Sequence, residues 1–447
     1  MRGARALVLG FRTALALWII AFLGRISPDL VPGQVTVAFL IVAILAGGIS
    51  AGRLPNGGAR DGAGVGFVAA MVSLLLLGSL LMSGETRDWM PSASLWIPGW
   101  LFAGTMLGAL GATAGRKWFS PIPIEPDWNA RFARLAAIAT LSLLAVGGLV
   151  TSRDAGLAVV DWPNSYGYNM FLYPLSRMTG NIFYEHAHRL FGSLVGLMTI
   201  ALFVRLLVTD RRRWVHLAAG IAVVLVVTQG ILGGLRVTGH FTTSTSPEAM
   251  RPNLGLAMLH GMLAQLFLAF MASLAAFNSP AWKRIEREEG AALPRPFTTD
   301  SQLTLIVWIT AFVQLLLGVH LRHTGRGLMM HIVFSIAVVI PAVLVGLRLV
   351  AQARTAPILR KIGSALLGHT GTQFLLGIGA LIATGMAGTA EPGASPPTGL
   401  HSVIVPTLHQ TVGALLFANI TLAHLWCRRI PRVESAEPGT AALSTTP

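Results

Sequence analysis

The sequence contains one cysteine among 447 residues, and only 11% of its residues are charged. A single cysteine, Cys427, excludes an intramolecular disulfide and a cluster of thiolate metal ligands. The low charge, with 53% hydrophobic residues and a mean hydropathy of +0.66, excludes an ordinary water-soluble domain. These scarcities predict an all-α protein that crosses a membrane many times.

Apolar runs of about 20 residues, the length that a helix needs to cross the hydrocarbon layer, recur twelve times. We therefore predict twelve transmembrane helices. Their approximate spans are 6–24, 35–52, 65–83, 95–115, 133–150, 189–208, 215–235, 254–277, 303–320, 328–348, 362–385 and 404–426.

Acidic residues are also scarce, since 18 Asp and Glu stand against 33 Lys and Arg, for a formal net charge of +15. A basic chain suggests nucleic acid as a partner, but here the basic residues collect in both tails and in the even-numbered connections between the predicted helices. This alternation follows the positive-inside rule and argues against nucleic acid. It predicts a multi-pass protein of the cell (inner) membrane with both termini in the cytoplasm. The connections predicted outside are 151–187, 236–253, 321–327 and 386–403.

Polar stretches divide the predicted helices into three groups of four. Residues 1–120 form a membrane region that carries no recognisable chemistry. Residues 131–280 and 301–427 form two further groups, separated by a charged loop. The tail, 434–447, is rich in Ala, Ser, Thr and Pro and is predicted to be disordered.

Four histidines lie near the ends of predicted membrane helices and form two pairs. His188 and His260 are 72 residues apart, and His331 and His409 are 78 residues apart. An imidazole at membrane depth is costly and calls for a partner, and a metalloporphyrin takes two facing imidazoles. The pattern predicts two heme sites near the outer leaflet, one in each of the last two groups.

A glutamine and glycine pattern repeats at nearly the same offset as the histidines. Gln229-Gly-Ile-Leu-Gly-Gly recurs 144 residues later as Gln373-Phe-Leu-Leu-Gly-Ile, and Gln314-Leu-Leu-Leu-Gly-Val is a third copy. Repeats at a fixed interval indicate a duplicated unit. The glutamines are expected to hydrogen-bond between helices, and the glycines to let helices pack closely or to leave room for a porphyrin.

Charged side chains accompany only the first histidine pair, in the segment Glu185-His-Ala-His188-Arg189. If this segment is helical, Glu185 and His188 share a face. A carboxylate near the porphyrin edge would transfer a proton or stabilise a developing charge. Arg189 would pair with Glu185 or with a heme propionate. The alternative is an interfacial helix start, where Glu185 and Arg189 reach the headgroups and His188 caps the helix.

The long connection 151–187 contains Trp162 and all four tyrosines of the chain. Aromatic residues at a membrane interface usually anchor to headgroups. The alternative is a lid over the porphyrin edge, because a hydrophobic substrate that enters from the membrane needs a cover during oxidation. The tyrosines are Tyr166, Tyr168, Tyr173 and Tyr184.

Four segments, in this order, resemble the heme A synthase family. They are Gly147-Gly148-Leu-Val-Thr151, Asp161-Trp162-Pro163, Glu185-His-Ala-His188-Arg189 and Gln229-Gly-Ile-Leu-Gly-Gly. The resemblance covers residues 131–427, and the combination is specific although each segment alone is weak. It implies two duplicated four-helix bundles, each of which holds a heme between two histidines.

By that resemblance, His188 and His260 face the substrate, heme o, and Glu185 is the functional glutamate. His331 and His409 are the ligands of a heme b cofactor. The implied reaction oxidises the C8 methyl of heme o to a formyl, by two successive hydroxylations and loss of water, and so gives heme A for terminal oxidase assembly. Heme O synthase and terminal oxidase assembly factors are then the expected partners, beside membrane lipid.

Two other classes of function fit the same histidines. A non-catalytic carrier with two hemes would pass electrons from quinol to an outer partner, and it would need neither Glu185 nor the long aromatic connection. A heme transporter or chaperone would bind heme reversibly and leave the porphyrin unchanged. The cysteine pair that some family members carry in outer loops is missing here, which removes any thiol-dependent step. Three further histidines, for which packing is the expected role, are His320, His323 and His369.

Overall fold

The computed structural model of the chain describes residues 2–26, 31–81, 90, 92–238, 253–289, 299–351, 357–385 and 399–430. Within these residues the protein is an all-α polytopic membrane protein. It has thirteen α-helices, of which twelve are long and apolar enough to cross a membrane. The tail predicted to be disordered, 434–447, lies outside the described residues.

Each of the twelve predicted spans corresponds to one helix, although most helices extend beyond the apolar run. The largest difference is at the sixth span, which begins at Gly180 rather than at 189, because its first two turns carry polar side chains that hydropathy does not mark. The helices are α1 (Arg2–Ile26), α2 (Gly33–Gly52), α3 (Ala59–Leu77), α4 (Ala93–Trp118), α5 (Trp128–Ser152), α6 (Gly180–Thr209), α7 (Arg213–Thr238), α8 (Leu254–Phe277), α9 (Pro280–Glu289), α10 (Thr299–Thr324), α11 (Leu328–Ala351), α12 (Pro357–Ala383) and α13 (Leu400–Arg429).

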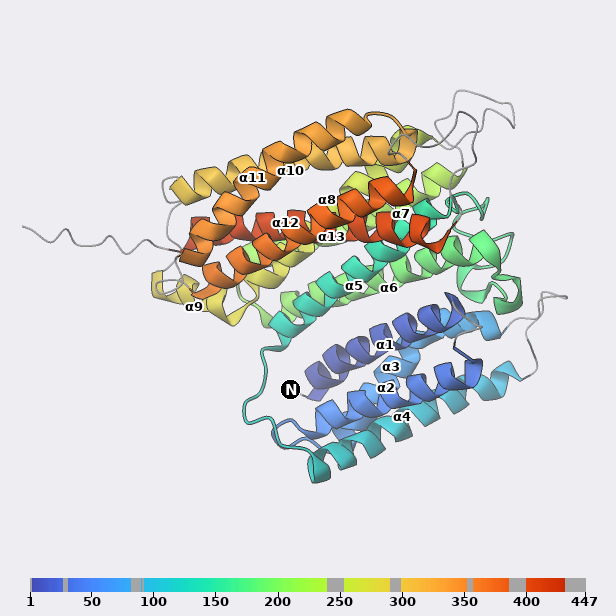
Figure 1. The fold of residues 1–447 in the computed structure, drawn as a ribbon. Helices are drawn as coiled ribbons and strands as arrows, with labels where there is room; N and C mark the ends of the chain where they lie inside the picture. Colours follow the sequence, from blue (N-terminus) through green and yellow to red (C-terminus); the bar gives the residue numbers. More distant parts are fainter. Residues whose placement is uncertain are drawn as a thin grey trace, which may run out of the picture.

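The long helices lie side by side in three groups of four (Figure 1). In the ring α5–α8 each helix packs against two neighbours, and the ring α10–α13 repeats this arrangement; α13 and α10 join the second ring to α5 and α8. Helices α1 and α3 pack the first group against α5 and α6. Residues 153–179, the long loop, lie at one end of the helices, the loop end. Residues 119–127 lie at the other, the linker end (Figure 1).

Glycine and alanine let the helices of the first group approach to backbone contact. A Cβ built at Gly66 of α3 would lie 1.9 Å from the carbonyl oxygen of Gly104 of α4, and one built at Gly108 would lie 2.2 Å from the carbonyl oxygen of Gly62. On α2, a Cβ at Gly52 would lie 2.0 Å from the Ala112 oxygen. Small residues four apart are the usual means of close helix packing in lipid, where hydrophobic association is absent. No larger residue fits at these crossings.

A buried arginine ties the first group to the core at the linker end. Arg5 of α1 forms ion pairs with Asp61 of α3 at 3.2 Å and with Glu125 at 2.6 Å. Trp128, the first residue of α5, donates to the other oxygen of Glu125 at 2.8 Å. The hydrogen bond from Arg5 holds the pKa of Glu125 below its usual value. One cation therefore joins α1, α3 and the start of the core.

The charged stretch 281–300, expected as a loop, is helical over its first part. Helix α9 lies along the linker end, where Lys283 pairs with Asp127 at 2.7 Å and Glu286 pairs with Arg212 at 2.9 Å. Its ten residues are too short and too polar to resemble a membrane span, which is why a search for apolar runs misses it. The helix also contacts the second ring, because the ring of Trp282 lies 5.2 Å from that of Trp426 in α13.

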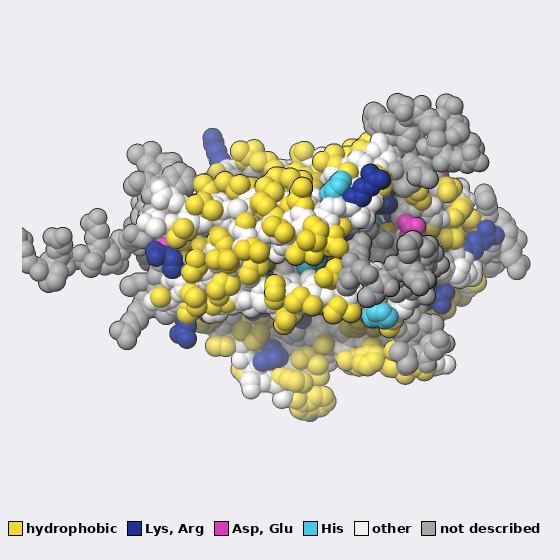
Figure 2. Space-filling view, turned by 45° about the horizontal axis from the view of Figure 1, so that its top comes forward, with side chains coloured by type: hydrophobic (Ala, Val, Ile, Leu, Met, Phe, Trp, Pro, Cys, Tyr) yellow, Lys and Arg dark blue, Asp and Glu magenta, His cyan; other side chains and the backbone are white. Residues whose placement is uncertain are grey.

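The surface of the protein fits a body that is embedded in a membrane. Figure 2 shows hydrophobic side chains over the middle of one face, with most Lys and Arg side chains towards its margins.

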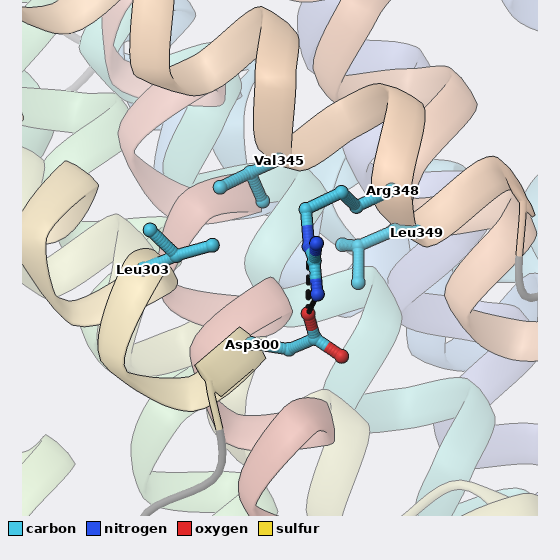
Figure 3. A pocket seen from close by; sticks show the side chains of 5 residues that line it. All are labelled: Asp300, Leu303, Val345, Arg348 and Leu349. Atoms are coloured by element: carbon cyan, nitrogen blue, oxygen red, sulfur yellow. Dashed lines mark hydrogen bonds and ion pairs between the residues drawn. The ribbon is translucent and has the colours of Figure 1, made fainter.

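At the linker end of the second ring, Asp300 of α10 accepts two hydrogen bonds from Arg348 of α11, at 2.7 and 2.9 Å. Figure 3 shows this pair beside Leu303 and Leu349.

The Glu125→Gln variant tests the attachment of the first group. Because the folded-state pKa of Glu125 is lowered, its charge stabilises the fold at neutral pH, and that contribution is lost as the pH falls through this pKa. In detergent near pH 7 we expect the variant to melt a few degrees below the wild type, and the gap to close below about pH 4. Asp154→Asn, an exposed position at the loop end, is the matched control. A gap that does not change with pH would contradict the assignment.

Candidate functional site

The structure brings the four predicted histidines together as two facing pairs. His188 of α6 and His260 of α8 come from diagonally opposite helices of the first ring, and their ring centres are 6.3 Å apart with planes at 82°. His331 of α11 and His409 of α13 repeat this in the second ring, at 6.3 Å and 81°. All four are half-buried and lie towards the loop end. Two sites of the same geometry therefore occur in one chain.

A glycine faces each of these imidazoles from the neighbouring helix. A Cβ built at Gly147, Gly233, Gly318 or Gly377 would lie 2.9, 3.5, 3.0 or 3.1 Å from the nearest ring atom of the four histidines in chain order. The glycines stand five or six residues before the ends of α5, α7, α10 and α12. In each ring, one diagonal pair of helices thus supplies the imidazoles and the other supplies the space for them. Sequence reasoning had favoured simple helix packing for these glycines.

Glutamines four residues before three of the glycines bond to the histidine-bearing helices, as predicted. Gln229 donates to the carbonyl oxygen of His260 at 3.1 Å, and Gln314 donates to that of His331 at 2.9 Å. The Gln373 amide nitrogen lies 3.3 Å from a ring nitrogen of His409. Each bond fixes a histidine against the opposing glycine. In α5 the corresponding position is Leu143, which cannot form such a bond.

The pairs fit the axial positions of a metalloporphyrin. Bonds between a metal and an imidazole nitrogen are about 2 Å long, so two of them in line, with about 1 Å from each nitrogen to its ring centre, give a ring separation of about 6 Å. The observed value is 6.3 Å in both pairs. In the described part of the chain no cluster of three or more His, Cys, Asp or Glu side chains would hold a bare metal ion. Two imidazoles suffice only where a macrocycle supplies the remaining ligands.

Arg189 holds the long loop over the first pair. Its guanidinium donates to the carbonyl oxygens of Val159 at 2.8 Å, Asp161 at 2.7 Å and Asn164 at 3.0 Å. The fourth acceptor is the carboxylate of Glu185, at 2.8 Å. All these groups bond to one side chain that is 8% exposed. Of the two partners predicted for Arg189, the structure shows Glu185.

Glu185 lies one helical turn from His188 on α6 and is 4% exposed. One carboxylate oxygen accepts from Arg189, and the other accepts from the backbone N–H of Val159 at 2.8 Å. Glu185 therefore also helps to hold the long loop. Any proton transfer by this carboxylate would require the loop contact to loosen.

The long loop has a packed aromatic centre. Tyr168 and Tyr173 are buried, with ring centres 5.6 Å apart, and Tyr173 lies 5.0 Å from the ring of His186. Burial raises the pKa of Tyr173 above its usual value. His186 is fully buried and its Nδ1 lies 3.1 Å from the Ser165 hydroxyl, so it supports the loop.

The long loop also reaches across the end of the ring to α7. The ring of Trp162 lies over Gly234, where a Cβ would be 2.4 Å from it. Asp161 accepts from the backbone N–H groups of Tyr166 at 2.6 Å and Gly167 at 2.8 Å, which fixes the turn that follows Trp162. The segment Asp161-Trp162-Pro163 thus bridges α6 and α7 at the loop end.

The remaining histidines lie outside the two facing pairs. A Cβ built at Gly261 would lie 3.9 Å from Nε2 of His323, so His323 reaches the first ring from the end of α10. His320 lies beside Gly327. His369 stands one turn before Gln373 in α12, and its Nδ1 is buried without a hydrogen bond in the described residues.

Sequence reasoning did not single out Gly147, the counterpart of the repeated glycines, nor two buried arginines near the pairs, Arg236 and Arg322. Gly147 could have been found from its position in the sequence, which matches that of the glycines in the repeats. Arginines in the last turns of apolar helices were the signal for the others, but such residues also occur as ordinary interface anchors.

Comparison with known proteins agrees with this geometry. Residues 130–330 match the family described as COX15-CtaA, cytochrome oxidase assembly protein. Over these residues the chain is similar to that family. The match covers the first ring and α10 and ends just before His331, and it supports a role in cytochrome oxidase assembly. No curated protein matches the chain.

The Arg189→Met variant tests the hold on the long loop. Hydrogen bonds to a charged donor each stabilise by about 1.5–3 kcal/mol, so the loss of four should free the loop without unfolding α6. We expect trypsin to cleave the variant in the native state several-fold faster at Arg153 or Arg177, both in the loop, as measured by mass spectrometry of the fragments. Arg326→Met, at an exposed site of the same end, should cleave like the wild type. Equal cleavage of both variants would refute the role of Arg189.

Proposed function

We propose that the chain is a heme A synthase, which oxidises the C8 methyl of heme o to the formyl of heme A. The observation that supports this most strongly is the repeated imidazole pair, at 6.3 Å in both rings, within a chain that matches the cytochrome oxidase assembly family. In this proposal the first ring takes the substrate and the second takes a heme b cofactor. Heme O synthase would supply the substrate, and terminal oxidase assembly would use the product.

The surroundings of the two pairs support this division. Only His188 and His260 lie beneath the long loop, with Glu185 one turn away. Glu185 and Arg189 would orient the loop, exclude water from the reacting edge and hold a proton acceptor near it. His331 and His409 would hold heme b, which supplies one-electron redox chemistry when bound.

A diheme electron carrier is the second candidate, and the near identity of the two pairs favours it. Because both pairs have one ring separation, with planes at 82° and 81°, each would hold a heme between two imidazoles, which suits electron transfer. Electron transfer has no need of the long loop, however, and the loop is the most elaborately bonded connection of the described chain. The proposal therefore favours chemistry at the first pair.

The orientation in the membrane follows from charge. The linker end carries Arg5, Arg212 and Lys283 with their partners. We propose that this end faces the cytoplasm, in accord with the positive-inside rule, so that both histidine pairs lie towards the outer leaflet of the cell membrane.

Analysis of the hemes made by a host that supplies heme o tests the function. Extraction and mass spectrometry should find heme A or its alcohol intermediate with the wild-type chain. Glu185→Gln should abolish the product, whereas Arg189→Met breaks the same ion pair and keeps the carboxylate, so product should be reduced but present. Equal loss in both variants would assign Glu185 to the loop alone. If the wild type yields only heme b and unchanged heme o, the synthase proposal fails.

The Gly147→Ala variant tests the space opposite His188. The new methyl would lie 2.9 Å from Cε1 of His188, which forces the imidazole away from its partner. We expect the purified chain to lose about half of its heme and the bis-histidine absorbance of one site. Gly192→Ala, in α6, is the control, since its Cβ would meet nothing within 4 Å. Unchanged heme content and spectrum in Gly147→Ala would show that the ring does not depend on this glycine.

A further inference from the structure

Two arginines lie next to the histidine pairs and form no ion pair with an acidic side chain of the described residues. Arg236 stands in the last turn of α7 and Arg322 in the last turn of α10, both at the loop end. The Nε atom of each is buried and has no hydrogen-bond partner in the described residues. Neither lies within ion-pair distance of a carboxylate there; Glu185 acts on Arg236 only from farther away and is held by Arg189.

Arg236 belongs to the first pair. It stands three residues after Gly233, the glycine that faces His260, on the same helix. Its guanidinium lies flat against the long loop, where a Cβ built at Gly156 would be 2.4 Å from Nη2. A side chain at this position of the loop would displace the guanidinium. The cation is thus enclosed between the loop and the imidazoles.

Arg322 belongs to the boundary between the rings, beside the second pair. It donates to the carbonyl oxygen of Gly148 at 3.2 Å and to the hydroxyl of Ser152 at 2.5 Å. The Ser152 hydroxyl also lies 2.8 Å from that of Thr407, two residues before His409 in α13. Arg322 stands one turn after Gly318, the glycine that faces His331, on α10. Both acceptors are neutral. They take up some of the guanidinium N–H groups, but in the described residues they do not compensate its positive charge.

A buried cation with no counter-ion is costly, and such a site is stabilised when an anion binds to it. The guanidinium presents paired N–H donors that match a carboxylate. The neutral imidazole pairs provide no negative charge, whereas a heme brings two carboxylates on one edge. The sequence suggested Arg189 as a partner of a heme propionate. In the structure, Arg189 already donates to four protein oxygens.

We propose that Arg236 and Arg322 bind the heme carboxylates, Arg236 at the first pair and Arg322 at the second. This inference rests on the proposed heme binding. It orients the carboxylate edge of both porphyrins towards the loop end. Because the C8 methyl of heme o adjoins a carboxylate-bearing position of the macrocycle, the reacting carbon then lies beneath the long loop, on the side of Glu185.

Redox titration of the full chain with Arg236→Met and Arg322→Met tests the assignment. Loss of a cation beside a heme favours the ferric state, so each variant should lower the midpoint potential of one heme, and the two variants should affect different hemes. Arg236→Lys and Arg322→Lys should shift the potentials less. Arg205→Met is the matched control, because Arg205 is also a buried arginine with an unpartnered Nε, near the other end of α6.

A second measurement needs no variant. The wild-type chain, produced without heme supply, is titrated with hemin and with hemin dimethyl ester, whose carboxylates are blocked. Loss of charge-assisted hydrogen bonds of about 1.5–3 kcal/mol should weaken binding of the ester by about tenfold or more. Equal affinity for both, or potentials that neither methionine variant changes, overturns the arginine assignment and leaves heme binding intact. A wild-type chain that binds no heme overturns both.

Discussion

The facing of two imidazoles across the centre of a helix bundle is the constraint on which the rest of the structure depends. A separation of 6.3 Å between ring centres requires that diagonal helices stand apart while neighbours stay in contact. Glycine at the level of each imidazole meets both demands, since a side chain there would displace the ring. Three glutamines then fix the helices in register. The same solution appears in both rings because the unit is duplicated.

Duplication explains the scaffold, and the differences between the copies explain how, in the proposed function, one chain would treat two hemes unequally. The first pair is covered by the long loop, which Arg189 and Glu185 hold from α6 and which Trp162 anchors on α7. Near the second pair, the described residues include a short turn, residues 325–327, between α10 and α11. A cover held by hydrogen bonds can open to admit a substrate, whereas a resident cofactor needs no such route.

Much of this was predictable because the membrane imposes a strong and simple pattern. Apolar runs gave all twelve spans, and the offset shared by His188 and Gln229 with their copies gave the pairing of the histidines. The pattern does not mark polar helix, so the early start of α6 and the whole of α9 were missed. The pattern of apolar runs also does not show which hydrogen-bond partners a polar side chain has in the fold. The carboxylate and guanidinium of Glu185 and Arg189 look free in the sequence and are fully engaged in the fold. The division into three units, and the roles of the individual site residues, stay predictions.

All four histidines lie towards the same end of the helices, and this placement bears on the energetics of any exchange between the sites. The rings join along α5, α8, α10 and α13, and Arg322 with Ser152 and Thr407 links the two rings at the level of the pairs. An electron that passes between two such sites moves parallel to the membrane plane, so it crosses little of the transmembrane potential. A duplicated unit inserted in the same orientation produces this arrangement directly, whereas an inverted repeat would have placed the second pair at the linker end.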